Sequence, residues 1–173
     1  MDEDTAVLSG GTTPFNHAVV KEYSGLASGT VISKRLPNLK TDRWNHACGS
    51  YTDGAGKRVG LPSPGLLVTL LQVLIVTGGF THLLTIDSTE ILSYPDGQAW
   101  TQGGKLVTPR DRLRGASLAG VFHVMGGWYN FETTKYYDGV FAWDPVTKTW
   151  SKVGTMGEAR NNHAIATIQD YCP

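Results

Sequence analysis

Apolar and polar residues alternate in short runs along this chain, and three of the apolar runs end in a pair of glycines. The runs are AVLSGG at residues 6–11, VLIVTGG at 73–79 and VFHVMGG at 121–127. Short alternating runs rich in β-branched residues are typical of β-strands. Each run is therefore predicted to be a strand that ends at its glycine pair.

The same elements follow each glycine pair in the same order. A polar loop leads to a strand with an aromatic residue, then to a further strand, and finally to an arginine that begins a last strand. The aromatic residues are Tyr23, Tyr94 and Trp143. The arginines are Arg43, Arg112 and Arg160, which follow the second glycine by 32, 33 and 33 residues. With 48 residues between Gly79 and Gly127, this spacing indicates a tandem repeat with a period of roughly 50 residues.

The repeated residues have physical roles in such a unit. Glycine adopts positive φ and lets a neighbouring backbone approach closely, which a residue with a Cβ atom resists. An aromatic residue and a tryptophan on adjacent strands would fill the space between stacked sheets. Structural roles are therefore predicted for the glycines and for four aromatic residues. These residues are Gly10, Gly11, Gly78, Gly79, Gly126, Gly127, Tyr94, Trp100, Trp143 and Trp150.

The segments HVMGG and FAWDPVTKTWSKVGTMGEARNNHA resemble kelch repeats, and the pattern extends from Val7 to Ile168. The resemblance implies an all-β fold, a kelch-type β-propeller fragment made of four-stranded antiparallel blades. It also implies that the chain begins in the second strand of one blade and stops after the first strand of another. The expected units are repeat 1 at residues 1–51, a loop and insertion at 52–72, repeat 2 at 73–120, repeat 3 at 121–169 and a tail at 170–173.

Two features depart from the repeat pattern. The first repeat has no tryptophan in its outer strand, where Val31 or Ile32 takes that place. The second feature is the surplus of residues between Arg43 and Gly78. Removal of residues 59–72 would join the flanking segments smoothly, so these residues are either a translated intron or an ordinary insertion.

Three repeats are too few to close a propeller, which needs about four to eight blades. The chain is expected to be a fragment of a larger propeller, or else two copies pair about a twofold axis into a six-bladed ring. In either case the terminal blades expose strand edges through which the chain is expected to self-associate.

Composition and charge exclude several classes of partner. The 15 basic and 15 acidic residues are scattered, so no basic surface is predicted for nucleic acid. The longest apolar run, residues 65–76, is too short for a membrane-spanning helix, which needs roughly 20 residues. Two distant cysteines give no disulfide framework. The N-terminal residues do not have the pattern of a secretory signal, which favours a cytoplasmic location.

The resemblance also implies where a partner would bind. In kelch propellers, one face is built from the loops between second and third strands and from the segments that lead into first strands. That face commonly holds a peptide or protein. Rigid aromatic side chains are favoured at such surfaces because they give contact area at low entropic cost. The candidate residues in the loops are His82, Trp128, Tyr129, Phe131 and Tyr136.

Arg43, Arg112 and Arg160 are further candidates, with two interpretations left open. They either bind carboxylates of a partner through paired hydrogen bonds or hold backbone carbonyls of the next blade. His46 and His163 recur three residues after an arginine, which favours a role in the scaffold.

No cofactor, metal or catalytic residue is predicted. His17, His82 and His123 do not have the spacing of metal ligands, and no nucleophile elbow, P-loop or zinc-binding helix motif is present. The expected function is a non-catalytic protein-interaction module, such as a ubiquitin-ligase substrate receptor or a cytoskeletal adaptor. The alternatives are a fragment of a carbohydrate-acting enzyme like galactose oxidase and a truncated product without a function of its own.

Overall fold

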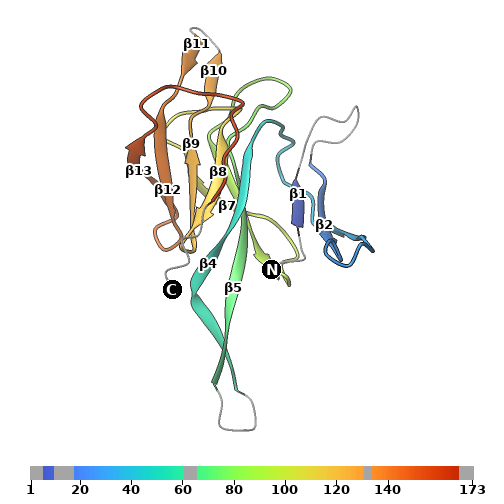
Figure 1. The fold of residues 1–173 in the computed structure, drawn as a ribbon. Coiled ribbons are helices and arrows are strands. Elements are labelled where there is room, and N and C mark those ends of the chain that lie inside the picture. The colour runs from blue at the N-terminus through green and yellow to red at the C-terminus, as the bar shows by residue number, and fades with distance from the viewer. Residues whose placement is uncertain (1–5, 10–17, 61–65, 131–133, 168–173) are drawn as a thin grey trace.

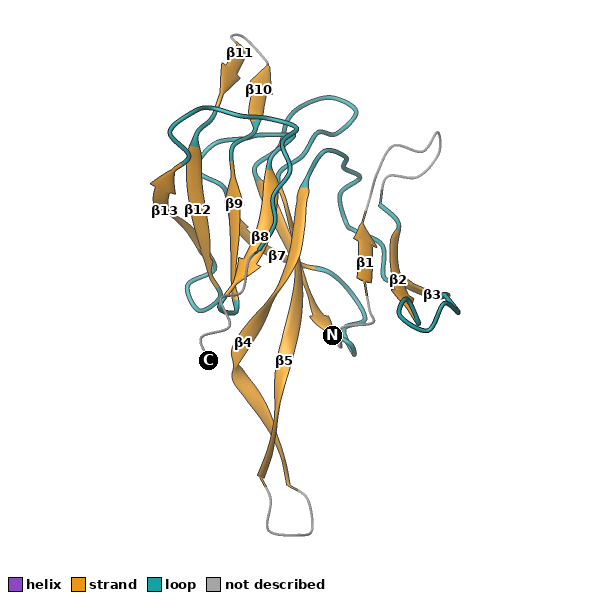
Figure 2. Cartoon of the chain, viewed as in Figure 1, coloured by secondary structure: helices purple, strands orange, loops and turns teal. Residues whose placement is uncertain are grey.

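The computed structural model describes residues 6–9, 18–60, 66–130 and 134–167. These residues form thirteen β-strands and no helix, which confirms the all-β prediction (Figures 1 and 2). No helix within the described ranges is therefore long and apolar enough to cross a membrane. The strands form three main sheets, which we call blades 1, 2 and 3, and a small hairpin.

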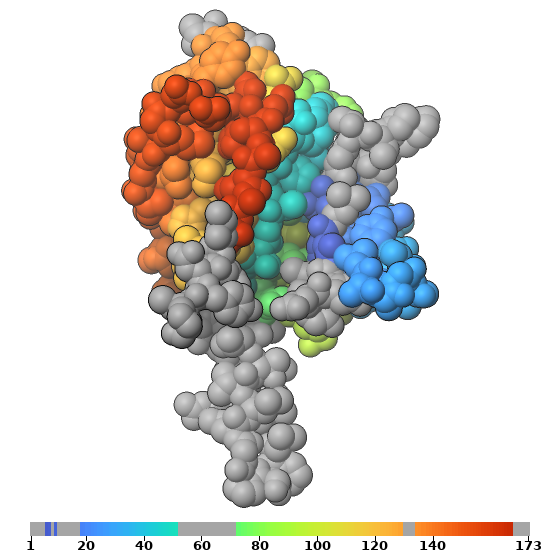
Figure 3. All heavy atoms as spheres, viewed as in Figure 1, coloured from blue at the N-terminus to red at the C-terminus, as the bar shows by residue number. Residues whose placement is uncertain are grey.

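The blades follow one another in chain order across the molecule (Figure 3). Blade 1 contains β1 (Ala6–Ser9), β2 (Val20–Ser24) and β3 (Ile32–Leu36). Blade 2 contains β4 (Ala47–Gly60), β5 (Leu66–Thr77), β6 (Ser88–Tyr94) and β7 (Thr101–Lys105). Blade 3 contains β8 (Arg114–Leu118), β9 (Val121–Met125), β12 (Gly139–Asp144) and β13 (Thr149–Thr155). The hairpin of β10 (Trp128–Asn130) and β11 (Thr134–Tyr136) joins β9 to β12.

Each blade is an antiparallel sheet in which neighbouring strands follow the chain. Blades 2 and 3 have the predicted four strands, whereas the described part of blade 1 has three. The strands that end in glycine pairs and the strands that follow them confirm the predicted order. One expectation is wrong, because residues 160–167 form no strand after the last arginine.

The alternation of apolar residues in β5 explains why the blades stack. Val73 and Ile75 belong to a buried cluster with residues of blade 3, such as Phe122. Leu74 and Val76, on the opposite face, belong to a second cluster with residues of blade 1. Because successive side chains of a strand point to opposite faces, a strand that is apolar throughout is buried on both sides.

The tryptophans at the outer strands link adjacent blades. Trp100 is buried and donates a hydrogen bond to the carbonyl of Pro37 (2.8 Å), at the end of blade 1. Trp150 is buried and donates to Oγ1 of Thr89 in blade 2 (3.0 Å). Its ring lies 5.2 Å from that of Trp143, so both indoles fill the space between blades 2 and 3.

Tyr94 was predicted to be the counterpart of Trp143 in its repeat, but it lies at a different position of the blade. Gly78 donates to the carbonyl of Ser88 at the start of β6, and Gly126 donates to the carbonyl of Gly139 at the start of β12. Counting from these carbonyls, the counterpart of Trp143 is the buried Leu92. Tyr94 lies two residues further along and packs, partly buried, against the cluster between blades 1 and 2.

The glycine pairs lie where two segments from different blades approach the same backbone. Gly78 and Gly79 have φ values of 65° and 102°. A Cβ atom on Gly78 would lie 2.7 Å from the carbonyl oxygen of Arg110, and one on Gly79 would lie 2.8 Å from that of Trp44. Gly126 and Gly127 repeat this arrangement, with φ values of 64° and 105°. The first pair, Gly10 and Gly11, lies outside the described residues.

Residues 52–60 and 66–72, within the segment predicted to be a loop and insertion, belong to β4 and β5. β4 and β5 continue beyond the other strands of blade 2 as a two-stranded ribbon (Figure 1). Their pairing runs from Ala47 with Thr77 to Gly60 with Leu66 and is interrupted between Asp53 and Lys57. Each backbone hydrogen bond of the ribbon extends the ladder that already exists in the blade, so the inserted residues continue the strands.

Candidate functional site

A cavity lies on the face where the β5–β6 loop, the β9–β10 connection and the segments before β4 and β8 meet. Its volume is about 290 Å³. The lining residues are Trp44, Asn45, Phe80, Thr85, Asp111, Arg112 and Trp128. This is the face on which the resemblance to kelch propellers predicts a partner.

Paired backbone hydrogen bonds hold the walls of the cavity. Trp44 and Phe80 exchange hydrogen bonds of 3.1 and 2.9 Å, and Asp111 and Trp128 exchange hydrogen bonds of 2.9 and 2.8 Å. Each pair joins the segment before a first strand to the residue after a glycine pair. The cavity is therefore built from backbone positions that recur in each blade, although its side chains differ.

Aromatic rings form much of the cavity wall. The ring of Trp44 lies 5.3 Å from that of Phe80 and 5.4 Å from that of His82, in tilted and edge-on arrangements. Such geometries are favourable for aromatic pairs and keep the rings in place. The site therefore presents rigid apolar surface beside a small number of polar groups.

Arg112 is the cationic group of the cavity. Its guanidinium carbon lies 4.3 Å from the centre of the Trp128 ring, and its Nε lies 3.7 Å from Oδ2 of Asp111. The side chain is 36% exposed. Stacking and the ion pair thus fix the orientation of a guanidinium that remains accessible to solvent.

Asp111 is almost fully buried beside Arg112. Burial raises the pKa of its carboxyl group, while the charge of Arg112 and the side chain of Asn45 oppose that rise. Oδ1 of Asp111 and Nε1 of Trp128 are buried without a hydrogen-bond partner among the described residues. Two residues that line the cavity therefore each have one buried polar atom without a described partner, and such atoms are unfavourable unless something pairs with them.

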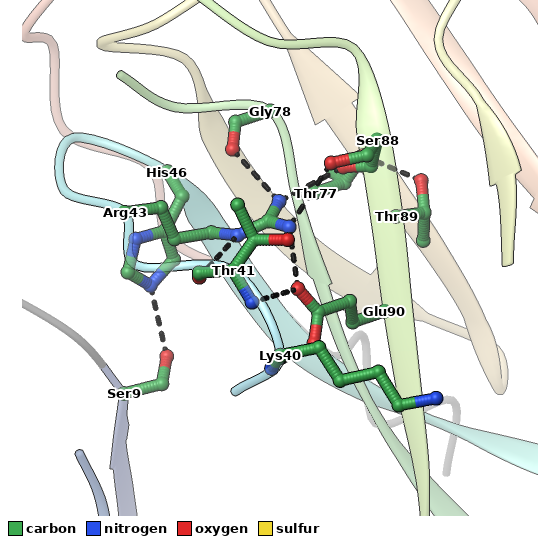
Figure 4. A network of polar contacts seen from close by, with 10 residues as sticks. All are labelled: Ser9, Lys40, Thr41, Arg43, His46, Thr77, Gly78, Ser88, Thr89 and Glu90. Atoms are coloured by element: carbon green, nitrogen blue, oxygen red, sulfur yellow. Dashed lines mark hydrogen bonds and ion pairs between the residues drawn. The ribbon is translucent and has the colours of Figure 1, made fainter. Parts of the chain in front are cut away.

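Arg43, a predicted binding residue, is not part of this cavity. Its side chain is 0% exposed, in the joint between blades 1 and 2. Nη1 donates to the carbonyls of Gly78 (3.0 Å) and Ser88 (2.9 Å), and Nη2 donates to Glu90 (2.7 Å) (Figure 4). A partner cannot reach this guanidinium, so the alternative interpretation, a fork that holds backbone carbonyls, applies to Arg43.

The counterpart of Arg43 in the next blade is Arg110, which corrects the sequence alignment. Arg110 is buried and donates to the carbonyl of Gly126 (3.2 Å), as Arg43 does to the first glycine of its own blade. Arg112 corresponds instead to Asn45, because both have positive φ (53° and 55°) and begin the turn into a first strand. Two arginines two residues apart allowed the sequence pattern to select the wrong one.

Aromatic rings replace the carboxylate partner at this second joint. Phe141 lies in β12 at the place that Glu90 has in β6. The guanidinium of Arg110 lies 4.8 Å from the Phe141 ring and 4.2 Å from the Tyr137 ring. The same arginine position is therefore stabilised by an ion pair in one joint and by cation–π contacts in the next.

The other predicted binding residues have different environments. Tyr136 is exposed in β11, opposite Trp128 in β10, and Tyr129 lies half-buried next to it. Arg160 is largely exposed and forms an ion pair with Glu158 (2.7 Å). Phe131 lies outside the described residues. The structure thus brings Arg112 and Trp128 together at the cavity. His82 joins them indirectly, because its ring contacts Trp44 in the cavity wall.

Sequence reasoning missed Trp44, Phe80 and Asp111. Phe80 and Trp128 both follow the second glycine of a pair. Trp44 follows Arg43, and Asp111 follows Arg110, the counterpart of Arg43 in the next repeat. The repeat itself therefore contained a signal for these positions, and for Asp111 the choice of Arg112 in place of Arg110 concealed it.

His46 lies behind the cavity wall, next to Asn45. Its Nε2 is 2.9 Å from Oγ of Ser9 in blade 1. Burial lowers its pKa to about 4, and the charges of Arg43 and Arg114 add to that effect, while the contact with Ser9 opposes it. The imidazole is therefore neutral in the folded protein at pH values where an unfolded chain would be protonated.

We expect this histidine to make the protein sensitive to mild acid. Because the folded pKa is lowered, its contribution to stability is present above pH 6.5 and is lost as the pH falls toward 4. The loss should reach about 2–3 kcal/mol near pH 4. Denaturant unfolding measured at several pH values should show a shallower pH dependence for His46→Gln than for the unchanged chain. An identical pH dependence in both would contradict the assignment.

Within the described ranges, no group of three or more His, Cys, Asp or Glu side chains could hold a metal ion.

Comparisons with known proteins agree with this architecture. Residues 112–157, which cover most of blade 3, match the Kelch motif family. The chain is similar in structure to YjhT, a kelch-type propeller protein, with a TM-score of 0.64 and 13% sequence identity. That similarity covers 90% of this chain and 49% of the YjhT chain, so the chain spans about half of that propeller. A search of curated proteins finds no match.

The chain therefore contains a Kelch motif at residues 112–157 and has the fold of a partial kelch-type propeller.

Proposed function

We propose that the chain is a non-catalytic binding module that holds a peptide segment of a partner protein at the cavity around Arg112. The main support is the exposed guanidinium, which is held between the Trp128 ring and the buried Asp111. An arginine fixed in this way loses little entropy when it binds, and its planar donors match a carboxylate.

The dimensions of the cavity favour a single side chain of the partner. A volume of about 290 Å³ lies at the lower end of small-molecule sites, which typically occupy roughly 300–1,000 Å³. The aromatic walls formed by Trp44, Phe80 and Trp128 would contact the apolar part of that side chain. We therefore propose that the segment presents an acidic residue, with its carboxylate on Arg112.

We expect peptides selected from a random display library against the 173-residue chain to carry an aspartate, a glutamate or a free C-terminal carboxylate. Arg112→Ala should weaken binding of the selected peptide at least about tenfold, because it removes a charged hydrogen-bonding group. Arg112→Lys should recover only part of that affinity, since lysine lacks the planar fork. Isothermal titration calorimetry would measure these dissociation constants.

Arg35→Ala is the matched control, because Arg35 is an exposed arginine of blade 1 away from the cavity. It should change the dissociation constant less than about twofold, as expected for a charge remote from an interface. Selected peptides without a carboxylate, or equal effects of the two alanine substitutions, would refute the proposed site.

A further inference from the structure

Blade 1, at one end of the array, has three described strands, whereas blade 3, at the other end, has four. Within the described residues β1 pairs only with β2, so its other edge has no strand partner among them. Blades 2 and 3 have a further strand, β4 or β8, on the corresponding edge. Blade 1 therefore presents an edge on which a first strand could pair through backbone hydrogen bonds.

Residues 160–167, which follow blade 3, have the position of a segment that leads into a next blade. The amide of Gly127 donates to the carbonyl of Arg160 (2.8 Å), and that of Asn162 donates to the carbonyl of Arg112 (3.1 Å). The segment before β8 makes the same two hydrogen bonds one blade earlier. The end of the described chain is thus held as though another blade followed it.

This segment also has the sequence of a first strand. RNNHAIAT at 160–167 and RWNHACGS at 43–50, which runs into β4, have Arg, Asn, His and Ala at the same places. The segment forms no strand and instead runs over blade 3 (Figure 3). There Thr167 donates to the carbonyl of Ser117 (3.2 Å), and Ile165 lines an apolar cavity of about 410 Å³.

A cavity lies beside the edge of β1 on which a first strand would pair. A cavity of about 260 Å³ lies between Val7 and Ser9 of β1 and Cys48 and Ser50 of β4. The first strands of blades 2 and 3 lie side by side, and Ser117 of β8 donates to the carbonyl of Ser50. A strand paired with β1 would lie at this cavity and flank β4 on its other side.

We propose that residues 163–167 of one copy pair with this edge of β1 in a second copy, and that the exchange is reciprocal. Two copies related by a twofold axis would satisfy both ends at once and form a closed ring of six blades. The structural comparison supports this stoichiometry, because one copy corresponds to 49% of the YjhT propeller chain. The proposal does not depend on peptide binding at Arg112.

Lys21 is the residue of blade 1 that would meet the incoming segment. Ala18 accepts a hydrogen bond from Leu39, as Asp87 accepts one from Leu106 one blade later. Lys21 lies three residues after Ala18, and Glu90 lies three residues after Asp87. Lys21 is therefore the counterpart of the carboxylate that binds Arg43 in the joint between blades 1 and 2.

The charges of the incoming segment fit this exchange. Arg160 of the second copy would approach Lys21 as Arg43 approaches Glu90, and two cations alone would repel each other. Glu158, held 2.7 Å from Arg160, supplies the opposite charge. The matching positions before Arg43 and Arg110 are threonines, so this carboxylate is specific to the end that would meet Lys21.

The mass of the 173-residue chain in solution tests the proposal. Sedimentation equilibrium at micromolar concentrations should give twice the chain mass of 18.7 kDa. Glu158→Lys should weaken the dimer at least about tenfold, because three cations would then meet at each joint. The double variant Glu158→Lys with Lys21→Glu should restore it. Both residues are exposed and lie at opposite ends of one copy, so this rescue requires contact between copies.

A second pair of variants tests the strand exchange itself. Neighbouring N–H groups of a strand point to opposite sides, so either Ile165 or Ala166 would donate a hydrogen bond toward β1. The double variant Ile165→Pro with Ala166→Pro removes that donor in either case. It should give a monomer with an unchanged circular dichroism spectrum, while Ile165→Thr with Ala166→Ser should remain a dimer. A monomer of the unchanged chain at all concentrations, masses that grow without limit, or failure of the charge exchange to restore the dimer would each overturn the proposal.

Discussion

Glu90→Gln is expected to lower the free energy of unfolding by about 3–5 kcal/mol, the usual cost of removing one partner of a buried ion pair. Glu90 is 0% exposed and accepts three hydrogen bonds from the segment that joins blades 1 and 2. The donors are the amides of Lys40 (2.7 Å) and Thr41 (3.1 Å) and the guanidinium of Arg43 (2.7 Å) (Figure 4). The amide of glutamine keeps one acceptor, but it leaves Arg43 as an uncompensated buried charge.

Urea-induced unfolding monitored by tryptophan fluorescence would measure this loss. Asp87→Asn is the control, because Asp87 lies 3.4 Å from an exposed Lys105 and such pairs contribute about 1 kcal/mol or less. The double variant Arg43→Met with Glu90→Met should be more stable than Glu90→Gln, since it leaves no charge in the joint. If Glu90→Gln cost no more than Asp87→Asn, the ion pair would not hold the blades together.

The strands were predictable because their side chains repeat a pattern with a clear physical cause. β5 and β9 end at glycines that two neighbouring segments approach, and β5 is apolar on both faces because it is packed between blades. Such requirements recur at every blade and therefore recur in the sequence. The fold class and the order of the strands followed from that repetition.

The alignment of the arginines could not be predicted in the same way. Arg110 and Arg112 both fit the spacing within two residues, and structural features such as the hydrogen bond from Arg110 to the carbonyl of Gly126 distinguish them. Leu92 in the place of Trp143 shows the same limit. A joint between blades requires a side chain that fills space, and several residue types meet that requirement.

The candidate site was predictable only in part. Arg112 and Trp128 were identified as binding residues, but the cation–π contact between them was not. Asp111 gave no signal by itself, because its importance comes from burial beside Arg112. Contacts between side chains of different blades depend on how the blades stack, and a repeat pattern does not encode that relation.

The glycine pairs suggest a second large effect, which concerns the backbone. Gly78→Ala is expected to lower the free energy of unfolding by about 3 kcal/mol, among the larger effects of single substitutions. Positive φ costs an alanine roughly 1–2 kcal/mol, and φ is 65° here. The new Cβ would also lie 2.7 Å from the carbonyl oxygen of Arg110, which accepts a hydrogen bond from Gly79. Relief of that contact would displace the segment around Arg110, which leads into β8 of blade 3.

Gly157→Ala separates these two contributions. Gly157 also has positive φ (83°), but a Cβ atom there would meet nothing within 4 Å. Its substitution should cost only about 1 kcal/mol, the backbone part of the effect. The difference between the two variants in denaturant unfolding therefore measures the close approach of the blades at Gly78. Equal losses would mean that φ alone requires this glycine, and that the segment of Arg110 can move aside without cost.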